Sequence, residues 1–103
     1  MSIWSRIAGN RSEVPLALVL YTRGECPLCD AMKAEIARAD LARGGARCEL
    51  REVDVDSDSA LAERYGRSVP VLEIGGRAAF KGRLTARELE AKIARALRER
   101  EPA

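Results

Sequence analysis

The chain of 103 residues contains no histidine, and this absence removes a large part of ordinary enzyme chemistry. Without an imidazole there is no histidine general base and no Cys–His or Ser–His–Asp nucleophile, and the common zinc enzyme sites lose their usual ligand. Any chemistry must therefore come from cysteine, carboxylate, lysine or backbone groups.

A strong excess of charge and long apolar runs are also missing. The 18 Lys+Arg residues against 16 Asp+Glu leave a net charge of +2, too small to indicate a nucleic acid or an anionic membrane as a partner. No stretch approaches the roughly 20 apolar residues that span a bilayer, and Arg6, Asn10, Arg11 and Glu13 interrupt any run typical of a signal peptide. We therefore expect one domain with a cytoplasmic location, because this length is too short for two independent cores.

Cysteine is scarce, and its number is odd. Cys26, Cys29 and Cys48 are the three cysteines of the chain. An odd number in a reducing compartment argues against a structural disulfide framework and favours a reactive pair with one bystander. Cys48 lies on an alternating polar–apolar stretch, and free cysteine is typically buried, so we predict that it packs in the core without a redox role.

The hydrophobic pattern predicts the element order β-α-β-α-β-β-α. Strands are expected at 16–22, 47–55, 69–74 and 77–81, and helices at 27–42, at 60–65 and after the capping box Thr85–Glu88. The first strand is almost continuously apolar, which is typical of burial on both faces, whereas the second should turn Cys48 and Leu50 inward. One βαβ crossover and a hairpin at Gly75-Gly76 give an α/β fold, a four-stranded mixed sheet with helices on both faces.

The N-terminal segment differs from the rest of the chain. We predict that residues 1–14 form a disordered arm and that the domain occupies residues 15–101. Ile3, Trp4 and Ile7 are, however, spaced as on one face of a helix. The alternative is therefore an added amphipathic element that covers a sheet edge or contacts a partner.

The sequence Cys26-Pro27-Leu28-Cys29 lies between the first predicted strand and the first predicted helix. At this place Cys26 occupies the N-cap, where free backbone N–H groups and the positive end of the helix dipole stabilise a thiolate. Cys29 follows one turn later and can close a disulfide with Cys26. The pattern predicts thiol–disulfide exchange, with Cys26 as the nucleophile and Cys29 as the resolving thiol.

A Cys-x-x-Cys pair is also half of a usual zinc or iron–sulfur site. A tetrahedral thiolate site needs a second pair of ligands, and this chain offers only Cys48 and no histidine. We therefore expect no metal site within one chain. The alternative that stays open is a non-catalytic iron–sulfur or metal-binding module that bridges two chains through Cys26.

From about Leu16 to Leu97 the chain resembles the thioredoxin-like superfamily, most of all the bacterial glutaredoxin-like proteins. The landmarks are Leu20-Tyr21-Thr22, Cys26-Pro27-Leu28-Cys29, Val53-Asp54-Val55-Asp56, Tyr65-Gly66 and Ser68-Val69-Pro70. The resemblance implies a thioredoxin-like fold with Cys26 and Cys29 as catalytic residues. It also implies a substrate-binding set: a cis Pro70 facing the cysteines, the backbone of Val69 pairing with the bound thiol or peptide, and a basic Arg23 near the thiolate.

The same resemblance implies no bound cofactor, disulfide-containing proteins or small thiols as substrates, and either glutathione or a thioredoxin-reductase-type flavoenzyme as the reductant. Two departures from the family concern glutathione. Leu28 stands where dithiol glutaredoxins usually carry an aromatic residue. The segment Phe80–Thr85 lacks the Gly-Gly-x-Asp-Asp-like stretch that grips glutathione in typical glutaredoxins. We therefore expect glutathione to be a poor co-substrate.

Overall fold

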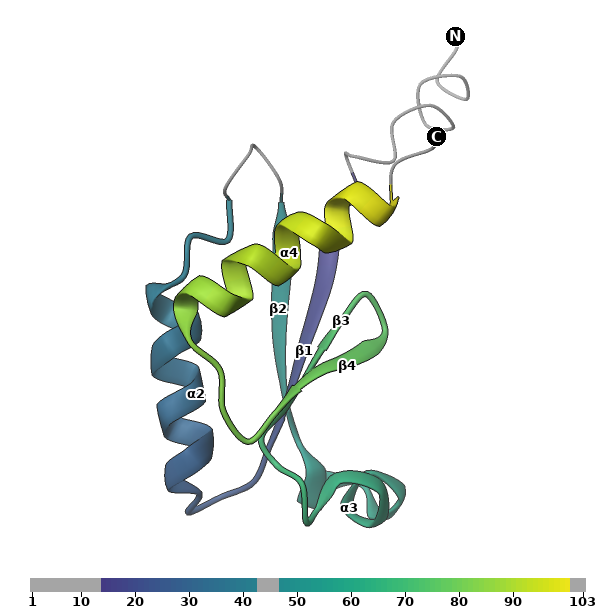
Figure 1. The fold of residues 1–103 in the computed structure, drawn as a ribbon. Helices are drawn as coiled ribbons and strands as arrows, with labels where there is room; N and C mark the ends of the chain where they lie inside the picture. The colour runs from purple at the N-terminus through teal and green to yellow at the C-terminus, as the bar shows by residue number, and fades with distance from the viewer. Residues whose placement is uncertain (1–13, 43–46, 101–103) are drawn as a thin grey trace, which may run out of the picture.

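The computed structural model describes residues 14–42 and 47–100 (Figure 1). Its elements are β1 (Leu16–Thr22), α2 (Pro27–Arg38), β2 (Cys48–Asp54), the 3-10 turn η3 (Val55–Ser57), α3 (Ser59–Tyr65), β3 (Val71–Ile74), β4 (Arg77–Lys81) and α4 (Ala86–Arg100). The predicted element order is confirmed. The predicted N-terminal arm, except for Val14, lies outside the described residues.

The four strands form one sheet in the order β2-β1-β3-β4. β1 pairs with β2 in parallel and with β3 antiparallel, and β4 is antiparallel to β3, so the sheet is mixed as predicted. Gly75 and Gly76 connect β3 to β4 with φ values of 59° and 87°. These left-handed conformations explain why glycine stands at both positions of the hairpin turn.

Helices cover both faces of the sheet, which also confirms the prediction. On one face, the side chains of β1 and β3 pack with α2 and α4, and the main core includes Leu18, Leu72, Met32 and Leu89. On the other face, α3 covers a smaller cluster centred on Val55, Tyr65 and Val71. Figure 1 shows α4 crossing the sheet with α2 beside it, while α3 lies at the end of the sheet where β1 leads into α2.

Burial of β1 on both faces was a wrong expectation. Leu16, Leu18, Leu20 and Thr22 are buried, whereas Ala17 is exposed and Tyr21 is half-buried. The reason is that α3 has only seven residues and reaches only one end of its face, where the rings of Tyr21 and Tyr65 lie 4.7 Å apart.

The first helix is shorter than the predicted range of 27–42. It ends at Arg38, and Ala39 is already extended, with φ −75° and ψ 147°. The Asp40 N–H donates to Glu90 Oε2 of α4 at 2.9 Å, and the Ala42 N–H donates to Asp40 Oδ1 at 3.2 Å. A contact with a distant helix therefore ends α2 before the glycines at 44 and 45 are reached.

Leu50 is 45% exposed, so the expectation that it turns into the core was wrong. It pairs with the buried Leu18 and shares its face of the sheet. β2 is an edge strand, however, and α2 ends too early to cover Leu50. Cys48, at the start of the same strand, is half-buried and packs against the margin of the main core.

Candidate active site

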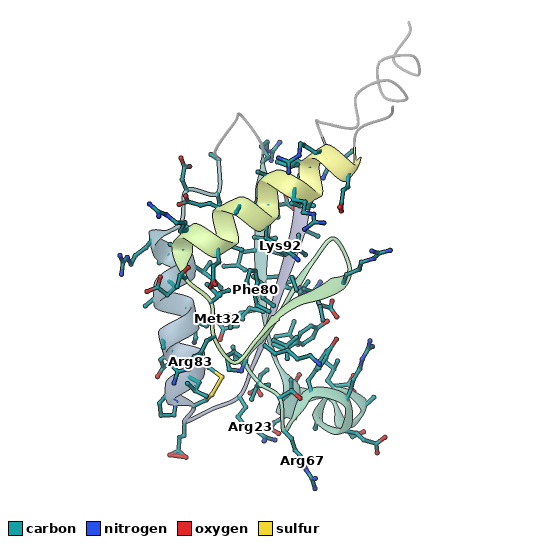
Figure 2. All side chains as sticks on the ribbon, viewed as in Figure 1. Arg23, Met32, Arg67, Phe80, Arg83 and Lys92 are labelled. Carbon is teal, nitrogen blue, oxygen red and sulfur yellow. A yellow bond between two sulfur atoms is a disulfide. The ribbon has the colours of Figure 1, made fainter. Side chains whose placement is uncertain are left out.

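The cysteine pair lies at the start of α2, directly after the central strand. Cys26 is the N-cap residue, with extended backbone angles of φ −122° and ψ 99°, and Pro27 opens the helix, where a missing N–H costs no hydrogen bond. The two cysteines form a disulfide with their Cα atoms 5.2 Å apart, drawn as the yellow bond in Figure 2. Cys26 Sγ accepts a hydrogen bond from the Cys29 N–H at 3.1 Å. The predicted N-cap geometry is confirmed.

The two sulfur atoms differ in accessibility. Cys29 is 1% exposed and belongs to the buried face of α2, whereas Cys26 is partly exposed. A bulky reactant can therefore approach Cys26 far more easily than Cys29. This asymmetry suits a division of labour between an attacking and a resolving sulfur.

Arg23 anchors the loop that precedes the cysteine pair. Its Nε and Nη2 atoms donate to the Asp56 carboxylate at 3.2 and 2.8 Å, and its Nη1 donates to the Gly66 carbonyl oxygen at 2.8 Å. The hydrogen bond from the guanidinium lowers the pKa of Asp56. These contacts tie the β1–α2 loop to η3 and to the end of α3. The contact of Arg23 with a substrate or thiolate stays a prediction.

A second ion pair holds α2 against the sheet behind the disulfide. Lys33, one helical turn after Cys29, places its Nζ 2.9 Å from Glu52 Oε2, and the buried Thr22 hydroxyl donates to the same oxygen at 3.0 Å. Both hydrogen bonds lower the pKa of Glu52, with the one from Lys33 having the larger effect. The helix that carries the cysteines is thereby fixed to β1 and β2.

Val69 and Pro70 lie on the segment between α3 and β3. The peptide bond between them is cis, as the resemblance implies, and Pro70 is buried while Val69 is half-buried. The Gly82 N–H donates to the Pro70 carbonyl oxygen at 2.8 Å. Since Arg23 binds Gly66 at the start of this segment, the segment connects the loop before Cys26 with the loop before α4. The substrate-binding roles of Val69 and Pro70 stay predictions.

A groove of about 420 Å³ adjoins the cysteine pair between α2 and the β4–α4 loop. It is lined by Leu28, Ala31, Met32, Glu35, Gly82, Arg83, Leu84, Thr85 and Glu88. Leu28 stands between the two cysteines in the sequence and is 41% exposed, so the groove reaches the helical turn that carries the disulfide. Figure 2 shows the labelled Arg83 and Met32 on this side of the disulfide.

The third cysteine is remote from the pair. Cys48 pairs with Leu16 at the beginning of β1, whereas the motif follows Thr22 at its end. The length of this strand separates them by roughly 20 Å. Burial raises the pKa of the Cys48 thiol, and the charge of Arg100 opposes this effect only in part. Both observations favour an unreactive thiol.

Neither a metal-binding cluster nor a membrane-spanning helix is found in the described parts of the chain. In residues 14–42 and 47–100, no group of three or more His, Cys, Asp or Glu side chains could hold a metal ion. Over the same residues, no helix is long and apolar enough to cross a membrane.

The sequence analysis assigns no role to Asp56 or to Arg83. A signal for Asp56 is nevertheless present in the sequence: parallel strands end at the same edge of a sheet, so a carboxylate after β2 should meet a cation after β1. Arg83 carries no comparable signal, because its position beside Leu28 depends on how α4 packs on α2.

The mixed sheet, the helices on both faces and the disulfide at the first helix define an α/β protein with a thioredoxin-like fold. Solved structures agree. Over 79% of this chain and 82% of the other, thioredoxin-2 of the malaria parasite aligns with a TM-score of 0.57 and 20% identity. Trxlp from Edwardsiella tarda aligns over 90% of this chain and 94% of its own, with a TM-score of 0.51 and 18% identity. Similarity at these identities shows the fold alone.

Residues 17–94 match the glutaredoxin-like domain (DUF836), and the chain belongs to this family. Protein XcR50 from X. campestris is 37% identical over 76% of this chain and 96% of its own, with a TM-score of 0.60. Protein Ne2328 from Nitrosomonas europaea is 26% identical over 76% and 91%, with a TM-score of 0.58. No curated protein matches the chain. The family, the fold and the Cys26–Cys29 pair together support a thiol-oxidoreductase type of role.

Proposed function

We propose that the protein is a thiol–disulfide oxidoreductase that works through Cys26 and Cys29. The observation that carries the proposal is the placement of an accessible and a buried sulfur at one helix N-terminus, close enough to form a disulfide. A thiolate at Cys26 gains from the Cys29 N–H, which already points at its sulfur, and from the positive end of the α2 dipole.

The reaction starts from the reduced pair. The Cys26 thiolate attacks one sulfur of the substrate disulfide, whose S–S bond breaks, and the departing thiolate takes up a proton. The Cys29 thiol loses its proton and attacks Cys26 Sγ, which releases the second substrate sulfur and forms the Cys26–Cys29 disulfide. Two electrons pass from the protein dithiol to the substrate. An external thiol or flavoenzyme then returns them.

The surrounding segments supply the binding surface in this proposal. The backbone of Val69, next to the buried Pro70, pairs with the substrate chain, and the groove from Leu28 to Arg83 takes its side chains. Arg23 serves mainly by holding the loop before Cys26, since three of its guanidinium hydrogen bonds go to Asp56 and Gly66. Arg23 is therefore a positioning residue as well as a candidate contact.

We further propose a cytoplasmic location and a reductant other than glutathione. The segment Phe80–Thr85 contains no acidic pair of the kind that a typical glutaredoxin carries after the hairpin, so we expect the usual contacts with glutathione to be lacking. Glutathione-driven turnover should be well below that of an ordinary dithiol glutaredoxin assayed in parallel. Equal turnover would show that other side chains supply the missing contacts.

The test of the proposed function is reduction of the insulin disulfides with dithiothreitol as the electron source. We expect the wild-type protein to accelerate the reaction and Cys26→Ser to abolish the effect. Cys29→Ser should lose turnover but accumulate a mixed disulfide on Cys26, which intact mass measurement detects. Cys48→Ser is the matched control and should keep the wild-type rate.

A wild-type rate no higher than that of dithiothreitol alone would contradict the proposal, and so would full activity of Cys26→Ser. Iron and sulfide analysis after anaerobic purification tests the alternative function, a non-catalytic iron–sulfur or metal-binding module. One cluster for every two chains, lost in Cys26→Ser, would support a module that bridges two copies through Cys26 instead of an oxidoreductase.

A further inference from the structure

The groove beside the disulfide has an apolar floor and rim. Met32 and Leu84 are buried at its base, and Leu28 and Ala31 are exposed along the α2 side. Leu28 is one of only three large hydrophobic residues that are exposed in the described part of the chain. An apolar side chain of a bound molecule would bury surface here, close to the sulfur of Cys26.

The two carboxylates of the groove are already engaged. Glu35 Oε1 accepts from the Ala86 N–H of α4 at 2.9 Å, and its Oε2 accepts from Arg38 Nη1 at 3.4 Å. Glu88 Oε1 accepts from the Thr85 N–H at 3.0 Å, which completes the predicted capping box. Both carboxylates therefore already have hydrogen-bond partners within the protein.

Arg83 is the cation of this groove, and its charge is not matched. Its side chain is exposed, and within residues 14–42 and 47–100 it forms no ion pair or hydrogen bond. Arg23, on the other side of the loop, is committed to Asp56. An exposed guanidinium beside an apolar surface favours a ligand that offers a carboxylate next to an apolar group.

We propose that Arg83 makes the protein selective for peptide disulfides that carry an acidic residue and an apolar residue next to the reacting cysteine. The inference rests on the proposed function and names its substrate class. The apolar side chain lies on Leu28 and Ala31, and the carboxylate pairs with Arg83. These two contacts stabilise the mixed disulfide on Cys26 and the transition state that leads to it. The attack that forms the mixed disulfide therefore becomes faster.

The test uses short peptides blocked at both ends, each with one cysteine activated as a thiopyridyl disulfide. In the first set of peptides, leucine stands next to the cysteine and is followed by Asp, Asn or Lys. In the second set, the leucine and the variable residue exchange places. The reduced protein attacks the peptide sulfur, and release of thiopyridone gives the rate constant of this single step. The thiopyridyl disulfide of glutathione, with the same leaving group, distinguishes a small acidic thiol from a peptide.

In at least one of the two peptide sets, we expect the Asp peptide to react roughly 2- to 5-fold faster than the Asn peptide, the range typical of one exposed charge pair. Arg83→Gln should bring this ratio to about 1, and Arg83→Glu should favour the Lys peptide. Arg77→Gln removes an exposed charge at the distant hairpin and should keep the wild-type ratio. The Asn peptide reports whether each variant still reacts normally.

A ratio that survives in Arg83→Gln, or that falls equally in Arg77→Gln, would overturn the selectivity. Faster reaction of the glutathione derivative than of the Asp peptide would assign the groove to a small acidic thiol and would also overturn it. Equal rates with all peptides contradict only the selectivity. No reaction with any peptide contradicts the proposed function itself.

Discussion

At the scale of single residues, the difference between Cys26 and Cys29 is the feature with the most direct chemical consequence. One sulfur is partly exposed and accepts a backbone N–H, and the other is buried in the face of α2 that packs on the sheet. In the proposed mechanism, the first sulfur ionises and attacks the substrate, and the second reacts only after a mixed disulfide has formed on Cys26.

We therefore predict that Cys26 of the reduced protein is the first cysteine to react with iodoacetamide near neutral pH. Peptide mass mapping after short exposure should find the label on Cys26, with Cys29 and Cys48 modified later. Cys48 serves as the internal control, because burial raises the pKa of its thiol. Earlier labelling of Cys29 or Cys48 would contradict the assignment of the nucleophile.

The Arg23–Asp56 pair gives a second prediction at this scale, on pH. The pKa of Asp56 is lowered in the folded protein, chiefly because of the hydrogen bond from Arg23. The ionised carboxylate therefore stabilises the folded state relative to the unfolded state. The stabilisation is present above the unfolded pKa of about 3.9 and is lost as the pH falls through the lower folded value. Asp56→Asn should be less stable than wild type at neutral pH, and the two should converge in acid.

Denaturant unfolding across a pH series measures this difference. Arg23→Gln and the double variant complete the cycle. At neutral pH the double variant should be no less stable than Arg23→Gln, which also loses the hydrogen bond to Gly66. A difference between wild type and Asp56→Asn that stays constant from neutral to acid pH would show that the ion pair does not stabilise the loop.

At the scale of elements, the short helix α3 ends at a position that only glycine fits. A Cβ on Gly66 would lie 2.4 Å from the backbone oxygen of Ala62 and 3.4 Å from Arg23 Nη2. The first contact is with a backbone oxygen, which cannot move away by a change of rotamer as a side chain can. The end of α3 and the anchor of Arg23 therefore depend on the same residue.

Gly66→Ala should accordingly lower the free energy of unfolding by about 1–3 kcal/mol, the range for forced overpacking. Gly24→Ala is the matched control, since a Cβ there meets no atom within 4 Å. Chemical denaturation compares the two variants. Equal stability of Gly66→Ala and Gly24→Ala would mean that the end of α3 adjusts without strain.

Some features of the helices and strands can be predicted from the sequence, and others cannot. Helix starts were predictable because their signals are local: Cys26-Pro27, Asp58 before α3, and the reciprocal bonds of Thr85 and Glu88. The end of α2 was not, because it depends on a hydrogen bond from Asp40 to Glu90 in a helix far along the chain. The exposure of Leu50 has a related cause, since the pattern of one strand does not tell whether a helix reaches the sheet edge.

At the scale of the whole molecule, the candidate site is assembled from segments that lie far apart in sequence. The loop after β1 supplies Cys26, the segment before β3 supplies Val69 and Pro70, and the segment before α4 supplies Gly82 and Arg83. Hydrogen bonds from Arg23 to Gly66 and from Gly82 to Pro70 join the three. The cysteine pair could be predicted from its motif, and the cis bond before Pro70 only through the family resemblance. The groove required the packed structure.

The central claim is that Cys26 and Cys29 form a reversible redox couple, and a redox titration tests it most directly. The protein is equilibrated in glutathione and dithiothreitol redox buffers that together cover the predicted range of potentials, quenched in acid and alkylated, and its mass is then measured. We predict one two-electron transition at roughly −270 to −120 mV, the range of thioredoxin-type proteins, with Cys48 a thiol throughout. A pair that stays oxidised below about −300 mV, as structural disulfides do, or that forms no disulfide at all, would contradict the account.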